Sequence, residues 1–147
     1  MTEVDFHFNA PDKQAYACRL LRKAYLKGAR LVVVTEPDAL TALDAALWTF
    51  STEDFLPHCR EGDAAHVLKH SPILLCSAVP TGVSGRAAAV LVNLRADMPR
   101  GYERFGRVIE VVATAQEDRE SARARWMQYR GAGIEPNRHD LRLAPQG

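Results

Sequence analysis

The sequence predicts an open three-layer α/β sheet, and three observations lead to this class. A strand, a helix and a second strand follow one another between Glu3 and Glu36, which makes a βαβ unit. Several later segments are continuous apolar runs, the pattern of strands buried on both faces of a parallel sheet. The chain has 147 residues, of which 47% are hydrophobic and 25% charged, enough for one globular domain with a real core. We therefore expect mostly parallel strands with helices on both faces of the sheet.

The first strand and helix follow directly from local patterns. Residues Glu3–Asn9 alternate between apolar and polar side chains, which predicts a strand with one apolar face. Pro11 and Asp12 are suited to a turn and a helix start, and the helix is expected to run to about Lys27. Gly28 is suited to end it, because glycine readily adopts the left-handed backbone conformation.

A buried strand and a second helix come next. Residues Arg30–Glu36 contain the run LVVV, which predicts a strand covered on both faces. Residues Pro37–Phe50 form the next predicted helix, and Ser51–Pro57 is expected to be a turn and irregular. Residues Cys59–His70 are polar and favour no element. The apolar positions of the predicted helix are Leu40, Leu43, Leu47 and Trp48.

The second half supplies three more strands and one more helix. Apolar runs predict strands at Pro72–Val79, at Ala87–Leu94 as the central strand, and at Arg107–Ala113. The last predicted helix is Glu117–Arg130. We expect residues 1–130 to form a single α/β domain and residues 131–147 to be an irregular C-terminal tail without periodicity.

The last predicted helix has an unusual stripe. Arg119, Arg123, Trp126 and Arg130 are spaced i, i+4, i+7 and i+11, which places them along one side of a helix. One interpretation is ordinary surface chemistry, since arginines at a helix C-terminus complement its dipole. The other is a site for an acidic partner that also brings an aromatic group. Arg125 lies off the stripe, and we expect it to face solvent and to be dispensable.

Composition limits the classes of function. The formal net charge is +1, whereas a protein that holds a nucleic-acid backbone usually carries a larger basic excess. Cys18, Cys59 and Cys76 are far apart and odd in number, which predicts reduced thiols rather than disulfides or a metal site. The N-terminus has no apolar segment of the signal-peptide kind, and no apolar run has the length of a membrane span. We expect a cytoplasmic protein.

Nucleotide-binding motifs are not found where this fold would need them. The turn after the first strand, Asn9–Asp12, has no glycine, so it matches neither dinucleotide-binding nor phosphate-cradling patterns. Gly82 and Gly85 follow a predicted strand but stand before another strand, which favours a hairpin loop. We therefore expect no functional dinucleotide motif and no cofactor.

The remaining candidate chemistry is equally weak. His66 and His70 have helix spacing i, i+4, but they lack the HExxH glutamate and a third ligand, so we expect no metal site. His58 beside Cys59 suggests a base and a nucleophile, yet adjacent side chains rarely face each other and no orienting acid is identifiable. We expect no catalytic residues, which favours a binding protein over an enzyme.

Three large aromatic residues form a second unusual patch. Trp48, Phe50 and Phe55 lie within eight residues across a helix end and the following loop. Packing of a loop onto the core is the ordinary explanation. Aromatic side chains at an irregular edge are also typical interface anchors, so an adaptor with two partners is the alternative.

Three segments of the sequence resemble a known family. The segments LDAALWTFSTEDFLPH (Leu43–His58), VLVNLRADMP (Val90–Pro99) and RARWMQYRGAGI (Arg123–Ile134) are similar to the chi subunit of bacterial DNA polymerase III holoenzyme, a clamp-loader accessory protein. The resemblance implies a Rossmann-like fold without nucleotide chemistry or catalytic activity of its own. It also implies two partners. These are the psi subunit of the clamp loader and the acidic C-terminal tail of single-stranded DNA-binding protein, with DNA reached only indirectly.

The resemblance also assigns residues to the tail site. Arg123 matches the family arginine that is critical for tail binding, and Arg119 stands where a lysine helps. Trp126 stands where another aromatic residue is usual, and Val112 matches an apolar pocket residue. Met127 replaces a lysine of the best-known members, so the cationic site is partly rearranged. With the outer arginine of the stripe, the expected tail-binding residues are Arg119, Arg123, Trp126, Arg130 and Val112.

On the other side of the molecule, Trp48 and Phe55 look like the aromatic residues that the family uses to bind psi. These expectations describe a cytoplasmic, nucleoid-associated replisome component with no membrane contact. The alternative is an α/β nucleotide-binding enzyme of unknown substrate. A third possibility is direct binding of DNA through the arginine-rich helix, which the near-zero net charge disfavours.

Overall fold

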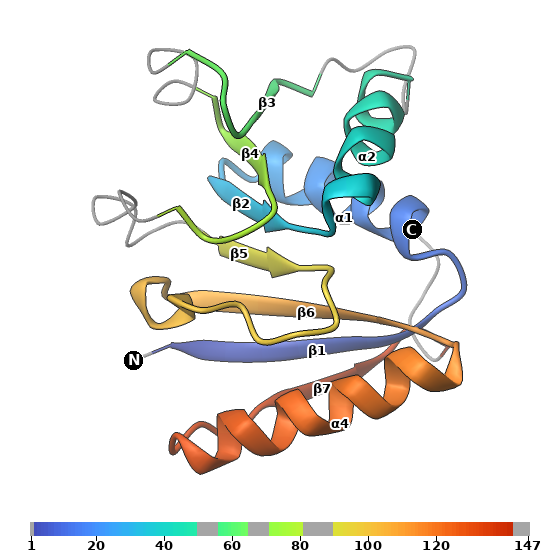
Figure 1. The fold of residues 1–147 in the computed structure, drawn as a ribbon, viewed down its shortest axis with the longest axis vertical. Coiled ribbons are helices and arrows are strands. Elements are labelled where there is room, and N and C mark those ends of the chain that lie inside the picture. Colours follow the sequence, from blue (N-terminus) through green and yellow to red (C-terminus); the bar gives the residue numbers. More distant parts are fainter. Residues whose placement is uncertain (1, 50–55, 65–70, 81–89, 143–147) are drawn as a thin grey trace.

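The computed structural model describes residues 2–49, 56–64, 71–80 and 90–142 (Figure 1). Strands and helices alternate along much of this chain, as the sequence predicts. In the described ranges, no helix has the length and apolar character needed to cross a membrane. The elements are β1 (Glu3–Ala10), α1 (Lys13–Leu26), β2 (Leu31–Val34), α2 (Pro37–Thr49), β3 (His58–Arg60), β4 (Ile73–Cys76), β5 (Val90–Asn93), the 3-10 helix η1 (Tyr102–Arg104), β6 (Arg107–Ala113), α4 (Gln116–Gly131) and β7 (Asn137–Asp140).

The described strands form one seven-stranded sheet in the order β3-β4-β2-β5-β6-β1-β7. Every neighbouring pair in this sheet runs parallel. The central place predicted for the Ala87–Leu94 strand is confirmed for β5, while residues 87–89 of that range lie outside the described residues. The α/β class with a largely parallel open sheet is therefore confirmed, and the open edges are β3 and β7.

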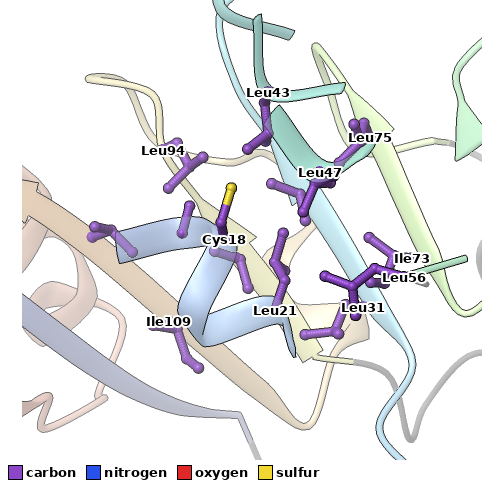
Figure 2. Close-up of a cluster of buried hydrophobic side chains, with 14 of the residues drawn as sticks. Cys18, Leu21, Leu31, Leu43, Leu47, Leu56, Ile73, Leu75, Leu94 and Ile109 are labelled. Carbon is purple, nitrogen blue, oxygen red and sulfur yellow. The ribbon is translucent and has the colours of Figure 1, made fainter. Parts of the chain in front are cut away.

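Helices cover both faces of the sheet, so the molecule has three layers. α1 and α2 pack on one face, where Figure 2 shows Cys18, Leu21 and Leu43 among the buried side chains. α4 covers the other face and runs along β1 and β6 (Figure 1). The LVVV run divides between the two cores: Leu31 and Val33 face α1 and α2, while Val32 and Val34 face α4. Burial on both sides is what a continuous apolar strand predicts.

The chain between β1 and β2 forms as its local signals predict. Asp12 caps α1, and its Oδ1 accepts a hydrogen bond from the amide of Ala15 at 3.0 Å. Gly28 has φ +84° and ends the helix. Asn9 also has a positive φ, 68°, which asparagine tolerates better than most residues. Its side chain donates to Asp140 Oδ1 at 2.9 Å, so this turn ties β1 to β7.

The expectation of an irregular tail after residue 130 is wrong for β7. Asn137–Asp140 pairs parallel with β1, and the amide of Leu141 extends the pairing by donating to the Phe8 carbonyl at 3.0 Å. The sequence NRHD carries no apolar alternation because this edge strand is largely exposed. Its position depends on polar contacts, including a hydrogen bond from Asn137 to Asp5 at 2.9 Å. Residues 143–147 lie outside the described part of the chain.

Candidate functional site

A pocket of about 330 Å³ lies between α4 and the β1–β7 edge of the sheet. Its floor comes from strands β1 and β6, one wall comes from α4, and β7 contributes the opposite rim. We call this site the α4 pocket, and its lining residues are Phe6, Phe8, Val112, Arg119, Ala122, Arg123, Trp126 and Arg138.

The strand pattern and the helix period bring these side chains together. Phe6 and Phe8 are two apart on β1 and therefore project from the same face of the sheet. Arg138 is the β7 partner of Phe6 in the register, which directs it to that face as well. Arg119, Arg123 and Trp126 follow the i, i+4, i+7 stripe along α4. The structure thus gathers four of the five residues expected for tail binding and adds residues that the sequence did not indicate.

The interior of the pocket is apolar. Trp126 is half-buried, and its ring lies 5.1 Å from that of Phe6 at an interplanar angle of 54°. Val112 is only 2% exposed and forms part of the core beneath α4. Phe8 is partly buried and extends the floor toward β7. A flat hydrophobic group can therefore pack against the partly buried rings of Trp126 and Phe8 and lose part of its contact with water.

The rim of the pocket is cationic. Arg119 and Arg123 are exposed, and their side chains make no hydrogen bond or ion pair with any residue that the structure describes. Arg138 reaches over the ring of Phe8, with its guanidinium carbon 5.3 Å from the ring centroid. Because carboxylates of the described chain do not neutralise these three groups, they are available to an external anion.

One expected site residue, Arg130, and Met127, which replaces a lysine of the family, lie beside the pocket rather than in it. Arg130 is one helical turn beyond Trp126, and its Nε is 3.7 Å from Glu135 Oε2. Met127 is 63% exposed and is not among the lining residues. On α4 the pocket lining therefore ends at Trp126. The helical spacing of the stripe, which continues to Arg130, did not predict this end.

The expectation that Arg125 faces solvent is wrong. Arg125 is 1% exposed and donates from Nε to Glu110 Oε1 at 3.0 Å and from Nη1 to the Ala96 carbonyl at 2.6 Å. Glu110 is fully buried in β6 and also accepts from the Tyr129 hydroxyl at 2.7 Å and from Asn93 Nδ2 at 2.8 Å. Burial raises the pKa of Glu110, whereas the Arg125 guanidinium and the hydrogen bonds oppose that rise. This network fixes α4 against the centre of the sheet.

The network also sets the direction of the pocket residues. Arg125 and Tyr129 are i, i+4 on α4 and both reach Glu110, so this side of the helix must face the sheet. With that side fixed, the helix period turns Arg123 and Trp126 toward β1 and β7. A signal for the network is present in the sequence, because Glu110 interrupts the apolar run RVIEVVA and a buried carboxylate needs a partner.

The aromatic patch at the other end of the sheet is only partly described. Trp48 is 56% exposed at the end of α2, and its ring lies 4.7 Å from that of His58. His58 has its Nε2 2.8 Å from Asp44 Oδ1 and its Nδ1 2.7 Å from the Leu56 carbonyl. Phe50 and Phe55 lie outside the described residues. An exposed indole beside an ordered imidazole is a suitable anchor for a partner surface.

The pairing of His58 with Asp44 was not identifiable from the sequence, but it does not make a catalytic dyad with Cys59. Cys59 is buried, and its Sγ lies 3.7 Å from the Ile73 carbonyl within the sheet. Successive strand residues point to opposite faces, so imidazole and thiol diverge. Burial also raises the pKa of the third buried thiol, Cys76, to about 12, which leaves it protonated.

A charged pair of the protein itself lies where open α/β sheets bind ligands. Such ligands lie at the carboxyl ends of strands, here beyond β1 and β6. Asp118 Oδ2 accepts from the Ala113 amide at 2.6 Å and lies 3.1 Å from Lys13 Nζ. This carboxylate, in the first turn of α4, ties the start of the helix to the end of β6 and to Lys13 of α1. In the described ranges, no group of three or more His, Cys, Asp or Glu side chains is placed to hold a metal ion. His66 and His70 lie outside those ranges.

Fold and site together define a small Rossmann-like α/β protein with an arginine-rimmed aromatic pocket beside its last helix. The chain belongs to the DNA polymerase III chi subunit family (HolC), whose sequence model matches residues 1–137. It is 32% identical to DNA polymerase III subunit chi of Pseudomonas aeruginosa, over 96% of this chain and 98% of that protein. It is 26% identical to DNA polymerase III subunit chi of Escherichia coli, over 82% of this chain and 80% of that protein.

A solved structure supports the fold alone. The structure of the S. cerevisiae Dbp5 L327V C-terminal domain bound to Gle1 H337R and IP6 aligns with this chain at a TM-score of 0.63. The alignment covers 94% of this chain and 90% of that chain at 12% sequence identity. The family membership places this protein among the accessory subunits of the replicative DNA polymerase, as the sequence predicted.

Proposed function

We propose that this chi-family protein is an adaptor in the clamp-loader complex. It links the psi subunit to the acidic C-terminal tail of single-stranded DNA-binding protein, in the bacterial cytoplasm at the replisome. The observation that carries the proposal is the α4 pocket. Arg119, Arg123 and Trp126 converge there with Val112, and neither arginine is paired with a described residue of the chain.

The chemistry of the pocket suits the end of such a tail. A terminal aromatic ring fits the apolar recess beside Trp126, above Val112, where it loses part of its contact with water. The free α-carboxylate is then received at the helix side by Arg123, whose guanidinium can hold it bidentately, and by Arg119 one turn away. The ring supplies hydrophobic contact, and the carboxylate supplies orientation.

Affinity at one pocket is expected to be modest. A short peptide with one buried ring and a few charge contacts binds in the micromolar range, which corresponds to roughly −8 kcal/mol. Single-stranded DNA coated by its binding protein displays many tails, so local concentration raises the effective affinity. Weak single contacts let the adaptor move along a filament without leaving it.

The experiment is a titration of the protein with an acidic peptide that ends in Phe with a free α-carboxylate. Arg123→Ala should weaken binding at least about tenfold, the equivalent of about 1.4 kcal/mol. The matched control is Arg130→Ala, which removes the same charge from the same helix outside the pocket. Unchanged affinity for Arg123→Ala, or equal losses in both variants, would remove the α4 pocket from the proposal.

The psi side of the proposal rests on Trp48. Its exposed indole contacts His58 of the edge strand β3, whereas the α4 pocket lies at the opposite, β7 edge of the sheet, so the two proposed sites do not overlap. Trp48→Ala should impair association with psi and leave the peptide titration unchanged. Loss of both interactions would indicate a folding defect, and undiminished psi binding would move the psi site elsewhere. Phe55 remains part of this prediction from the family resemblance.

The proposal is preferred to the alternatives for specific reasons. An α/β nucleotide-binding enzyme is disfavoured because the turn at the end of β1, Asn9–Asp12, has no glycine for a phosphate-binding loop, and because the carboxylate of Asp118 lies beside the end of β6. Direct binding of DNA through α4 is disfavoured because the net charge is only +1. A thermal shift with added nucleotides, or a mobility shift with single-stranded DNA alone, would revive one of them.

A further inference from the structure

The α4 pocket has a cationic group on the side opposite to α4, and it comes from the strand that the sequence did not reveal. Arg138 lies on β7, paired in register with Phe6 of β1. Its side chain therefore rises from the sheet face that α4 covers, across the pocket from Arg119 and Arg123. Arg119 and Arg123 thus lie on one side of the apolar floor and Arg138 on the other, so the three arginines do not form one patch.

Arg138 is also held in place better than an ordinary surface arginine. Its backbone is fixed by parallel pairing with β1, and both neighbours of Arg138 contact Asp5. Asn137 donates to Asp5 Oδ1 at 2.9 Å, and His139 Nε2 lies 3.5 Å from the same oxygen. The guanidinium lies over the ring of Phe8, which leaves its edge available for planar hydrogen bonding. A group positioned in advance loses less conformational freedom when a ligand binds.

We propose that the α4 pocket grips an acidic peptide end from two sides. In this arrangement Arg119 and Arg123 receive the α-carboxylate, while Arg138 receives a side-chain carboxylate of a residue preceding the terminal aromatic residue. Arg138 is thus a specificity-determining residue that reads acidic character upstream of the C-terminus. This inference rests on the proposed function, because it assigns a second anion-binding position to the same pocket.

The allocation follows from the shape of the ligand and the pocket. The terminal ring and the α-carboxylate belong to one residue, so a ring that packs against Trp126 of α4 places its own carboxylate near the helix rim, where Arg119 and Arg123 lie. The chain must then leave the pocket toward the opposite rim, where Arg138 is the lining cation. A planar guanidinium suits a side-chain carboxylate there better than a backbone carbonyl, because both partners are charged.

The test is a double-mutant cycle between protein and peptide. Three peptides are titrated. The first contains Asp residues before a terminal Phe with a free α-carboxylate. The second has these Asp residues replaced by Asn, and the third is the first peptide as a C-terminal amide. Arg138→Ala should weaken the first peptide about three- to tenfold and leave the Asn peptide nearly unchanged. Arg123→Ala should instead reduce the preference for the free carboxylate over the amide, because Arg119 alone then remains to receive the carboxylate.

Two further variants separate this role from general charge or a loss of structure. Arg142→Ala removes the same charge near β7, but Arg142 pairs with Asp140 and does not line the pocket, so it should have little effect. Arg138→Lys keeps the charge without the planar fork and should recover only part of the loss.

The outcomes of the cycle separate the two proposals. An equal loss for the acidic and Asn peptides, or an equal loss in Arg142→Ala, would overturn the role of Arg138 while the tail site stands. If the wild-type protein binds none of the peptides, both the proposed function and this inference fail.

Discussion

Replacing Arg125 tests whether the buried network holds α4 on the sheet. We consider Arg125→Met, which keeps the length of the side chain but removes the charge. The change deletes the contacts of Nε with Glu110 Oε1 at 3.0 Å and of Nη1 with the Ala96 carbonyl at 2.6 Å. Glu110 stays fully buried, with only Tyr129 and Asn93 as hydrogen-bond donors. A buried carboxylate without its counter-charge is strongly unfavourable.

The expected loss in the free energy of unfolding is about 3–5 kcal/mol, the usual cost of removing one partner of a buried ion pair. The lower part of that range is favoured because Arg125 Nη2 has no hydrogen-bond partner among the described residues, so the native pair is not fully satisfied. Domains of this size are stable by about 5–15 kcal/mol, so the variant should lose a large share of its stability.

The assay is urea unfolding followed by tryptophan fluorescence, with Arg130→Met as the matched control. Arg130 is on the same helix, but its side chain is 52% exposed and its ion pair with Glu135 is 3.7 Å long. Removing an exposed pair should change stability by at most about 1 kcal/mol. The variant that carries Arg125→Met together with Glu110→Gln should recover part of the loss, since no unpaired charge remains. Equal stability of the two single variants would refute the reasoning.

Further predictions concern pH, salt and one departure from the family pattern. Burial and then His139 lower the pKa of His7 to about 4, below its unfolded value near 6.5. The native state therefore disfavours the protonated imidazole of His7. As the pH falls from 6.5 to 4, the free energy of unfolding should decrease by at most about 3 kcal/mol, and solvent screening reduces this figure because His7 is partly exposed. Urea unfolding at several pH values should show that the free energy of unfolding depends less on pH in His7→Gln than in the wild-type protein. Affinity for the acidic peptide should fall as salt rises, and a salt-independent titration would mean that the arginines are structural. Met127→Lys should strengthen peptide binding a few-fold, since it adds a cation one residue from Trp126, and no gain would show that position 127 is too far from the ligand.

The strands that could be predicted are those whose own residues form a continuous apolar run. The predicted bounds Arg107–Ala113 agree with β6, and the buried LVVV run agrees with β2. The edge strands were missed because their pairing depends on residues distant in sequence. β7 is held by β1 through Asp5 and Asn9, and β3 is a three-residue strand, His58–Arg60, paired with β4. Local periodicity carries no information about such partners.

The residues that line the α4 pocket were predicted only in part, again because some of them depend on partners distant in sequence. Helix spacing and family resemblance identified Arg119, Arg123 and Trp126, which lie on one element. Arg138 was missed because it reaches the pocket only through the pairing of β7 with β1. Arg125 was assigned to solvent because the stripe defines only one side of α4, whereas Glu110, its partner, lies in another segment. Charged residues are placed by their partners, and a partner far along the chain is visible only once the sheet is assembled.

We propose that this protein joins psi to single-stranded DNA-binding protein, and a bridging assay tests this role most directly. Single-stranded DNA is immobilised and coated with its binding protein, and labelled psi is added with or without this chain. We predict that psi is retained only when the chain is present. We also predict that Arg123→Ala prevents retention by releasing the tails and that Trp48→Ala prevents it by releasing psi. Retention of psi with Arg123→Ala at the wild-type level, or no retention with the wild-type chain, would contradict the account.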